Sequence, residues 1–189
     1  MIEVEIEDEA WTAALPDAEA LTVAAAEAAL TAIDPPPQGE AAEGRRGLKP
    51  PAPAALNPLS RFATAPPEGE HPSHIVVLLT GDAAVRDLNA RFRDQDKATN
   101  VLSFPAAENP QGHLGDIALA YGVCAGEAQA QGKRLCDHLQ HLVAHGVLHL
   151  LGYDHMNDDE AQQMEGLERV VLAGLGVADP YAEGERDHD

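Results

Sequence analysis

The sequence predicts a single α+β domain, in which a mixed sheet of about four strands packs with helices around one central, histidine-rich helix. Three observations support this fold class. Segments typical of strands and of helices alternate along most of the 189 residues. Apolar residues make up 44% of the chain, enough for one sizeable core. No uninterrupted run of about 18 apolar residues occurs, so the sequence does not indicate a transmembrane helix.

The first strand is predicted at residues 2–6, where isoleucine and valine alternate with glutamate in the period-2 pattern of a half-buried strand. Pro16 and Asp17 then open a segment rich in Ala, Glu and Leu. We expect this segment to be helical to about residue 33, with Asp17 near the positive end of the helix dipole.

The next elements follow from residue 74 onward. The β-branched and apolar run at 75–79 is typical of a strand covered on both faces. Thr80 is a suitable N-cap for a helix to residue 93, and Val85, Leu88 and Phe92 recur on one face of it. Strands are then expected at 100–104 and 114–120, and helices at 122–131, 137–151 and 158–175.

The domain is expected to span residues 1–175, interrupted by a proline-rich insert or flexible loop at 34–72. Ten of the chain's 14 prolines fall in this insert, which therefore neither continues a helix nor supplies core side chains. Residues 176–189 are expected to form an acidic C-terminal tail. The first residues lack the pattern of a secretory signal, and two cysteines, Cys124 and Cys136, are too few for a disulfide framework. These features favour a reduced, cytoplasmic setting.

The formal net charge of −20 disfavours binding to nucleic acid or to membrane headgroups, because a field of that sign repels polyanions. The charge is unevenly distributed, however. Between residues 86 and 97 four bases, Arg86, Arg91, Arg93 and Lys97, stand against three acids. A polyanion would have to bind such a local patch against the field of the whole chain.

The residues with the clearest chemistry are His145, His149 and His155. Histidines four residues apart on a helix lie about 40° apart around its axis and about 6 Å along it, so both rings can reach one ion. Gly152 stands where a left-handed C-terminal cap is expected, and that reversal returns His155 toward the same ion. Three neutral imidazoles leave a fourth position for water, which is typical of catalytic zinc. The spacing therefore predicts a site for one zinc ion.

Other interpretations of the neighbouring residues remain open. His141 and His145 form another pair four residues apart, but only His145 and His149 directly precede the glycine turn. The spacing is also that of the metzincin metalloproteases, H-E-x-x-H-x-x-G-x-x-H. Gly146 stands where those enzymes have the glutamate that acts as general base. The geometry of a protease site is kept, whereas its proton acceptor is missing.

Four stretches in sequence order closely resemble the signature of the YbeY family of bacterial endoribonucleases, the rRNA maturation factors: 88–93, 99–105, 114–117 and above all 145–155. The resemblance covers nearly everything from His74 to Leu175, and more weakly the N-terminal strand and helix. The insert at 34–72 is longer than we expect for the family.

This resemblance implies a metal ion on the three histidines and single-strand-specific cleavage of RNA. It also implies roles in small-subunit rRNA 3′-end maturation and in ribosome quality control, with RNA and the small ribosomal subunit as partners and with neither DNA nor a membrane. The important arginine of the family falls on Arg93, where a guanidinium suits a bidentate grip on phosphate. A cation at a helix C-terminus is also favoured by the dipole alone.

Two alternatives belong to other functional classes. One is a metalloprotease of metzincin geometry, which would need a proton acceptor other than residue 146. The other is a ribosome-associated RNA-binding module in which zinc only stabilises the fold.

Overall fold

The sheet is mixed and has four strands among the residues that this computed structural model describes, 1–33, 74–107 and 112–182. Its order is β1 (Ile2–Ile6), β2 (His74–Thr80), β4 (His113–Ala120) and β3 (Val101–Pro105). The first three strands run parallel, and β3 pairs antiparallel with β4 at the edge. The predicted α+β fold with a mixed sheet of about four strands is confirmed. The insert predicted at 34–72 lies outside the described residues.

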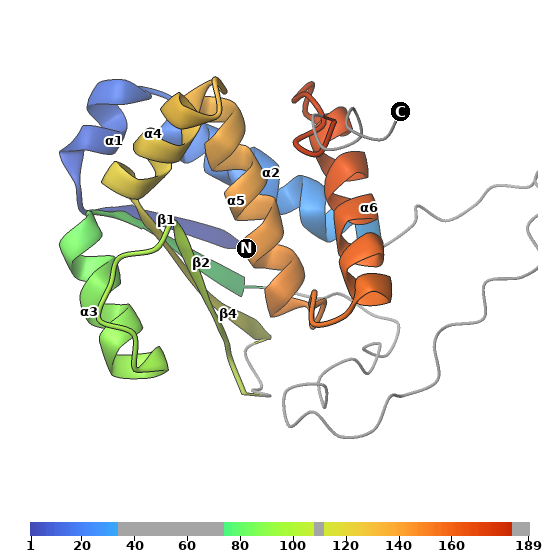
Figure 1. The fold of residues 1–189 in the computed structure, drawn as a ribbon, viewed down its shortest axis with the longest axis horizontal. Helices are drawn as coiled ribbons and strands as arrows, with labels where there is room; N and C mark the ends of the chain where they lie inside the picture. Colours follow the sequence, from blue (N-terminus) through green and yellow to red (C-terminus); the bar gives the residue numbers. More distant parts are fainter. Residues whose placement is uncertain (34–73, 108–111, 183–189) are drawn as a thin grey trace, which may run out of the picture.

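The helices lie on both faces of this sheet (Figure 1). One face is covered by α3 (Asp82–Arg93), and the other by α2 (Ala18–Ile33) and α5 (Leu135–Leu150), with α6 (Asp158–Gly174) packed outside against α2 and α5. The short helices α1 (Glu9–Ala14) and α4 (Tyr121–Ala130) complete the fold. Because α5 packs against α2, α4, α6, β3 and β4, it is the central helix that the sequence predicted.

The larger hydrophobic core fills the space between the sheet and α5. Ile75, Val77 and Leu79 are fully buried there, as expected for alternate positions of a central strand. The buried face of α2 consists of small residues (Ala18, Thr22, Ala25, Ala26 and Ala29), which allow α2 and α5 to pack closely. A smaller core lies under α3.

The start of α3 differs from the prediction. Thr80 does not cap this helix, because it is still paired in β2 and its hydroxyl donates a hydrogen bond to Glu7. Gly81 is the N-cap residue instead. Helix α1 was not predicted, since it has only six residues; Asp8 caps it by accepting a hydrogen bond from the Ala10 N–H.

Cys124 and Cys136 are free thiols in this structure. Cys124 lies in the larger core, and burial raises the pKa of its thiol to about 12. Across the described residues, we find no helix with the length and apolar character needed to span a membrane.

Candidate metal centre

The turn after α5 has the conformation that the sequence predicted. Gly152 has a φ of +89°, in the left-handed region that favours glycine. Its N–H donates to the His149 carbonyl at 3.0 Å, and the N–H of Tyr153 donates to the Leu148 carbonyl at 3.0 Å. This pair of bonds is a Schellman motif, which ends the helix and reverses the chain.

As a result, His145, His149 and His155 come together. One ring nitrogen from each lies within 4.8 Å of the others. Both helical rings are half-buried, whereas His155 is exposed at the rim. The three residues predicted from spacing thus form one cluster of nitrogen donors, open on one side.

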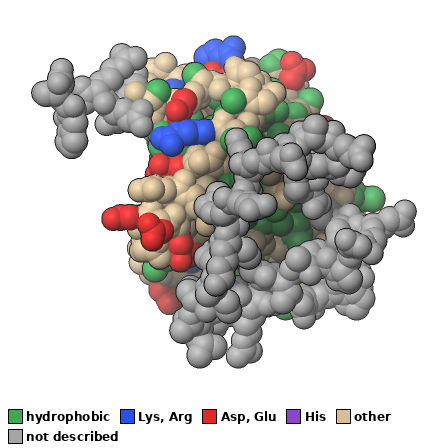
Figure 2. Space-filling view, turned by 90° about the vertical axis from the view of Figure 1, so that its right-hand side faces the viewer, with side chains coloured by type: hydrophobic (Ala, Val, Ile, Leu, Met, Phe, Trp, Pro, Cys, Tyr) green, Lys and Arg blue, Asp and Glu red, His purple; other side chains and the backbone are tan. Residues whose placement is uncertain are grey.

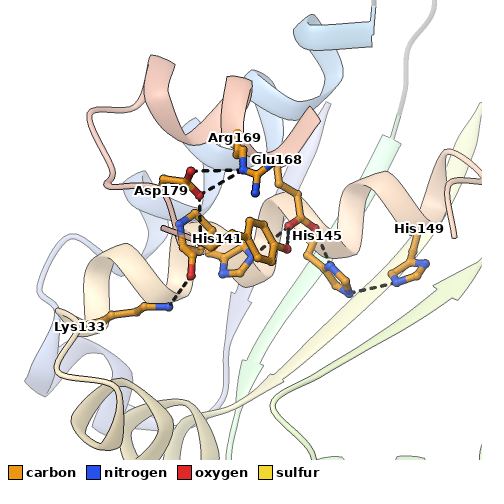
Figure 3. Close-up of polar contacts among 9 residues, drawn as sticks. Lys133, His141, His145, His149, Glu168, Arg169 and Asp179 are labelled. Atoms are coloured by element: carbon orange, nitrogen blue, oxygen red, sulfur yellow. Dashed lines mark hydrogen bonds and ion pairs between the residues drawn. The ribbon is translucent and has the colours of Figure 1, made fainter. Parts of the chain in front are cut away.

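The hydrogen bonds of the two helical rings decide which nitrogen of each is available. The Nδ1 of His149 lies 3.0 Å from the carbonyl oxygen of Tyr153, which can only accept, so we assign the proton to Nδ1. The Nδ1 of His145 lies 2.7 Å from the Glu168 carboxylate and is assigned as a donor for the same reason. Both Nε2 atoms then face the centre of the cluster, 3.0 Å apart (Figure 3).

This arrangement fits a divalent cation. Two imidazole lone pairs at 3.0 Å repel each other unless a proton or a metal ion lies between them. A proton serves two rings, whereas here the ring of a third histidine joins them. Two nitrogens bound tetrahedrally to one zinc ion would be about 3.4 Å apart, close to the separation observed. Burial, with the nearby His145 and His155, lowers the pKa of His149 to about 4, which favours the neutral form that a metal ligand needs.

Glu168 of α6 is the acidic centre of this region. Its side chain is fully buried and accepts hydrogen bonds from His145 Nδ1 at 2.7 Å, from His141 Nε2 at 3.1 Å and from the Tyr181 hydroxyl. Burial alone would raise the pKa of Glu168, but these bonds outweigh it and lower the pKa to about 2. His141 is therefore held by Glu168 and is not part of the cluster formed by His145, His149 and His155.

Sequence reasoning missed both Glu168 and Tyr181. The signal for Glu168 was present, because it falls on the buried stripe of α6 with Met164, Val171 and Leu172. A charged residue on an apolar stripe needs a buried partner. Met164 itself is 1% exposed and packs in the core.

The segment after α6 holds Tyr181 in place. Arg169 contacts the Asp179 carboxylate at 3.2 Å and lies over the Tyr181 ring, and Lys133 donates to the Pro180 carbonyl (Figure 3). Tyr181, His141 and His145 also line a cleft of about 280 Å³. Glu127 also lines this cleft and accepts hydrogen bonds from Asn100 and from His138.

Arg93 lies at the C-terminal end of α3, and its exposed guanidinium donates to the Ser103 carbonyl on β3 at 3.2 Å. Ser103 is buried, with its hydroxyl directed toward Gly146 of α5. One residue of β3 thus separates Arg93 from the helix that carries the histidines. Asp154 forms the turn, since it accepts a hydrogen bond from the backbone N–H of His155.

Gly146 has a packing role that explains why no glutamate stands there. A Cβ atom at this position would lie 3.0 Å from Ile117 Cδ1 and 3.2 Å from Ser103 Oγ. Both contacts are tighter than ordinary van der Waals distances. A larger side chain at position 146 would therefore start against the sheet and not beside the metal cluster.

The chain is similar to a family of known proteins. The sequence model of the family described as endoribonuclease YbeY matches residues 57–176. An endoribonuclease YbeY from Azorhizobium caulinodans is 43% identical over 186 residues, with 96% of each chain covered. One from Paramagnetospirillum magneticum is 40% identical over 190 residues, again with 96% of each chain covered. In fold, the chain is similar to the solution structure of TM1509 from Thermotoga maritima, with a TM-score of 0.50, 20% identity and full coverage of both chains.

Proposed function

The chain belongs to the endoribonuclease YbeY family, and from this premise we propose that it is a zinc-dependent, single-strand-specific endoribonuclease. Its proposed role is the maturation of small-subunit rRNA at the 3′ end and ribosome quality control in the cytoplasm. Its partners would be RNA and the small ribosomal subunit, with neither DNA nor a membrane. The observation that carries the proposal is the convergence of three histidine nitrogens within 4.8 Å in a chain of this family.

In this proposal His145, His149 and His155 hold one zinc ion. When bound, the ion supplies electrophilic activation of a phosphate oxygen or of water. The protein's own contribution is to fix the rings that hold it. Glu168 accepts a hydrogen bond from the Nδ1–H of His145, and the Tyr153 carbonyl accepts one from the Nδ1–H of His149, so that each Nε2 stays available as a ligand.

Arg93 is the proposed catalytic residue. Only one of its N–H groups makes a hydrogen bond in the described structure, to the Ser103 carbonyl, and a guanidinium carries five. The remaining donors are available to bind a phosphate in the bidentate manner that arginine favours. There Arg93 orients the phosphodiester and stabilises the negative charge that gathers on it during displacement.

The surroundings of Gly146 argue against the metalloprotease alternative. A glutamate there would direct its first carbon into Ile117 and Ser103, so it would not reach a substrate at the cluster without displacing them. Among the described residues, the nearest buried carboxylate, Glu168, is held by His141, His145 and Tyr181 and is not free to accept a proton from water.

The test is cleavage of a single-stranded RNA by the zinc-loaded protein and three variants. His145→Ala and Arg93→Ala should each lower kcat by about a hundredfold or more. Arg86→Ala is the matched control, because it removes an arginine from the same helix whose partner is the exposed Asp96; it should cleave within about twofold of wild type. If all variants cleave equally well, a contaminating nuclease is responsible and the proposal is wrong.

His149→Ala separates the enzyme from an RNA-binding module with a structural zinc. The enzyme should remain folded by circular dichroism and lose cleavage, since the larger core does not include the histidines. A module stabilised by zinc should unfold. A casein-type substrate should not be hydrolysed in either case; its chelator-sensitive hydrolysis would support the protease instead.

A further inference from the structure

Phe92, in the last turn of α3, is an aromatic side chain without a place in the core. It is 62% exposed, and it is the only exposed residue among the Phe, Trp and Tyr side chains in the described part of the chain. The sequence placed it on one helix face with Val85 and Leu88, but only Val85 is fully buried. Because Phe92 directly precedes Arg93, this exposed ring lies next to the proposed catalytic residue.

The surroundings of Phe92 hold its ring in place. Phe104 of the edge strand β3 meets it in a T-shaped contact, with centroids 5.3 Å apart and an angle of 64°. The guanidinium carbon of Arg91 lies 5.7 Å from the ring centroid. On the side of the molecule shown in Figure 2, by contrast, the visible Lys and Arg side chains lie beside Asp and Glu side chains.

We propose that Phe92, flanked by Arg91 and Arg93, is a stacking platform for an unpaired base of the single-stranded RNA substrate, an inference that rests on the proposed function. Every nucleobase has a π face, so stacking on an aromatic side chain is tolerant of sequence. A base in a duplex is already stacked and paired. A platform of this kind therefore gives a physical reason for a preference for single strands.

The position of the platform connects it to the metal centre. Arg93 directly follows Phe92 and donates to the carbonyl of Ser103. The Ser103 side chain lies against Gly146, the neighbour of His145 in the chain. A strand whose base rests on Phe92 would present an adjacent phosphate to Arg93, which is the group that the proposed reaction needs.

Stacking also gives a way for a chain with a net charge of −20 to bind RNA despite electrostatic repulsion. Of the four cationic side chains between residues 86 and 97, Arg86 is already paired with Asp96, at 2.6 Å. Few cations are therefore left there to bind phosphates. An interaction between rings releases no counterions and hence does not weaken as salt is added. The platform supplies affinity that the electrostatic field of this chain does not.

The experiment combines cleavage kinetics with a fluorescence measurement. Phe92→Ala and Phe92→Leu should raise KM for a single-stranded RNA by about fivefold to a hundredfold with little change in kcat, because each removes the π face. Phe92→Tyr should stay within about twofold of wild type. Val170→Ala is the matched control, since Val170 is 63% exposed on α6; it should have no effect.

The second readout does not depend on cleavage. Metal-free protein should quench an RNA oligonucleotide that contains 2-aminopurine, and Phe92→Leu should abolish the quenching. Arg93→Ala should lower the slope of log affinity against log salt, whereas Phe92→Ala should leave that slope unchanged. RNA cleavage with normal KM in Phe92→Ala, or no quenching by wild type, would overturn the platform; in that case a protein partner is the better explanation for the exposed ring. Quenching without cleavage would refute the proposed reaction and leave the platform standing.

Discussion

Replacement of Glu168 by glutamine tests the structure of the metal centre most directly. The carboxylate is fully buried and accepts from three donors, His141, His145 and Tyr181. Glutamine has nearly the same shape but only one acceptor oxygen. In either orientation, its NH₂ group faces a donor that the carboxylate satisfied. If it faces His145, the ring must move its proton to Nε2, the nitrogen that the metal ion needs.

The size of the effect follows from these contacts. Loss of a partner that orients a metal-bound histidine typically lowers metal affinity 10- to 100-fold, which corresponds to about 1.4–2.7 kcal/mol. A hydrogen bond to a charged group is worth about 1.5–3 kcal/mol, which overlaps the range for the loss of metal affinity. We therefore expect Glu168→Gln to bind zinc 10- to 100-fold more weakly than wild type.

The assay is competition for zinc with a chromophoric chelator, together with thermal unfolding of the metal-free protein. Glu165→Gln removes the same charge from the same helix and should bind zinc normally. Tyr181→Phe removes one donor to Glu168 but leaves its bond to His145, and should stay within about twofold of wild type. A folded Glu168→Gln protein with wild-type zinc affinity would refute the conclusion that this carboxylate fixes His145.

Two further predictions concern packing and pH. Gly146→Ala should lower the free energy of unfolding in urea by about 1–3 kcal/mol, because the added methyl group meets Ile117 and Ser103; unchanged stability would mean that α5 does not pack so closely on the sheet. Burial raises the pKa of Cys124 to about 12, and burial with the bond to Glu168 raises that of Tyr181. The unfolded state therefore loses these two protons at a lower pH than the folded state does, and the free energy of unfolding should fall as pH rises above about 9. A urea midpoint that stays constant from pH 8 to 11 would contradict this prediction.

The sequence was sufficient for elements and motifs that depend on local pattern. The alternating residues of β1 and the β-branched run of β2 gave strands close to those observed. The spacing of His145, His149 and Gly152 gave the cluster, because helix geometry and a left-handed glycine determine it over eleven residues.

The contacts that support the cluster are long-range and could not be predicted in this way. Glu168 lies 23 residues from His145 and reaches it only because α6 packs on α5. Tyr181 was assigned to an acidic tail by composition, yet its hydroxyl donates to Glu168. Helix α1 was missed because six residues carry too little periodicity, although Trp11 anchors it through a hydrogen bond to the Thr80 carbonyl.

Position 146 shows how packing and chemistry are connected in this chain. The two helical histidines are four residues apart, a spacing that lets both reach one cation, and three positions lie between them. The first of these, position 146, faces β3 and β4, where a Cβ atom would lie only 3.0 Å from Ile117 and 3.2 Å from Ser103. The close approach that excludes a glutamate there also brings Ser103 against α5, and the carbonyl of Ser103 holds Arg93. Gly146, where the chain departs from the protease pattern, and the proposed phosphate-binding Arg93 are therefore both connected to the packing of α5 on β3.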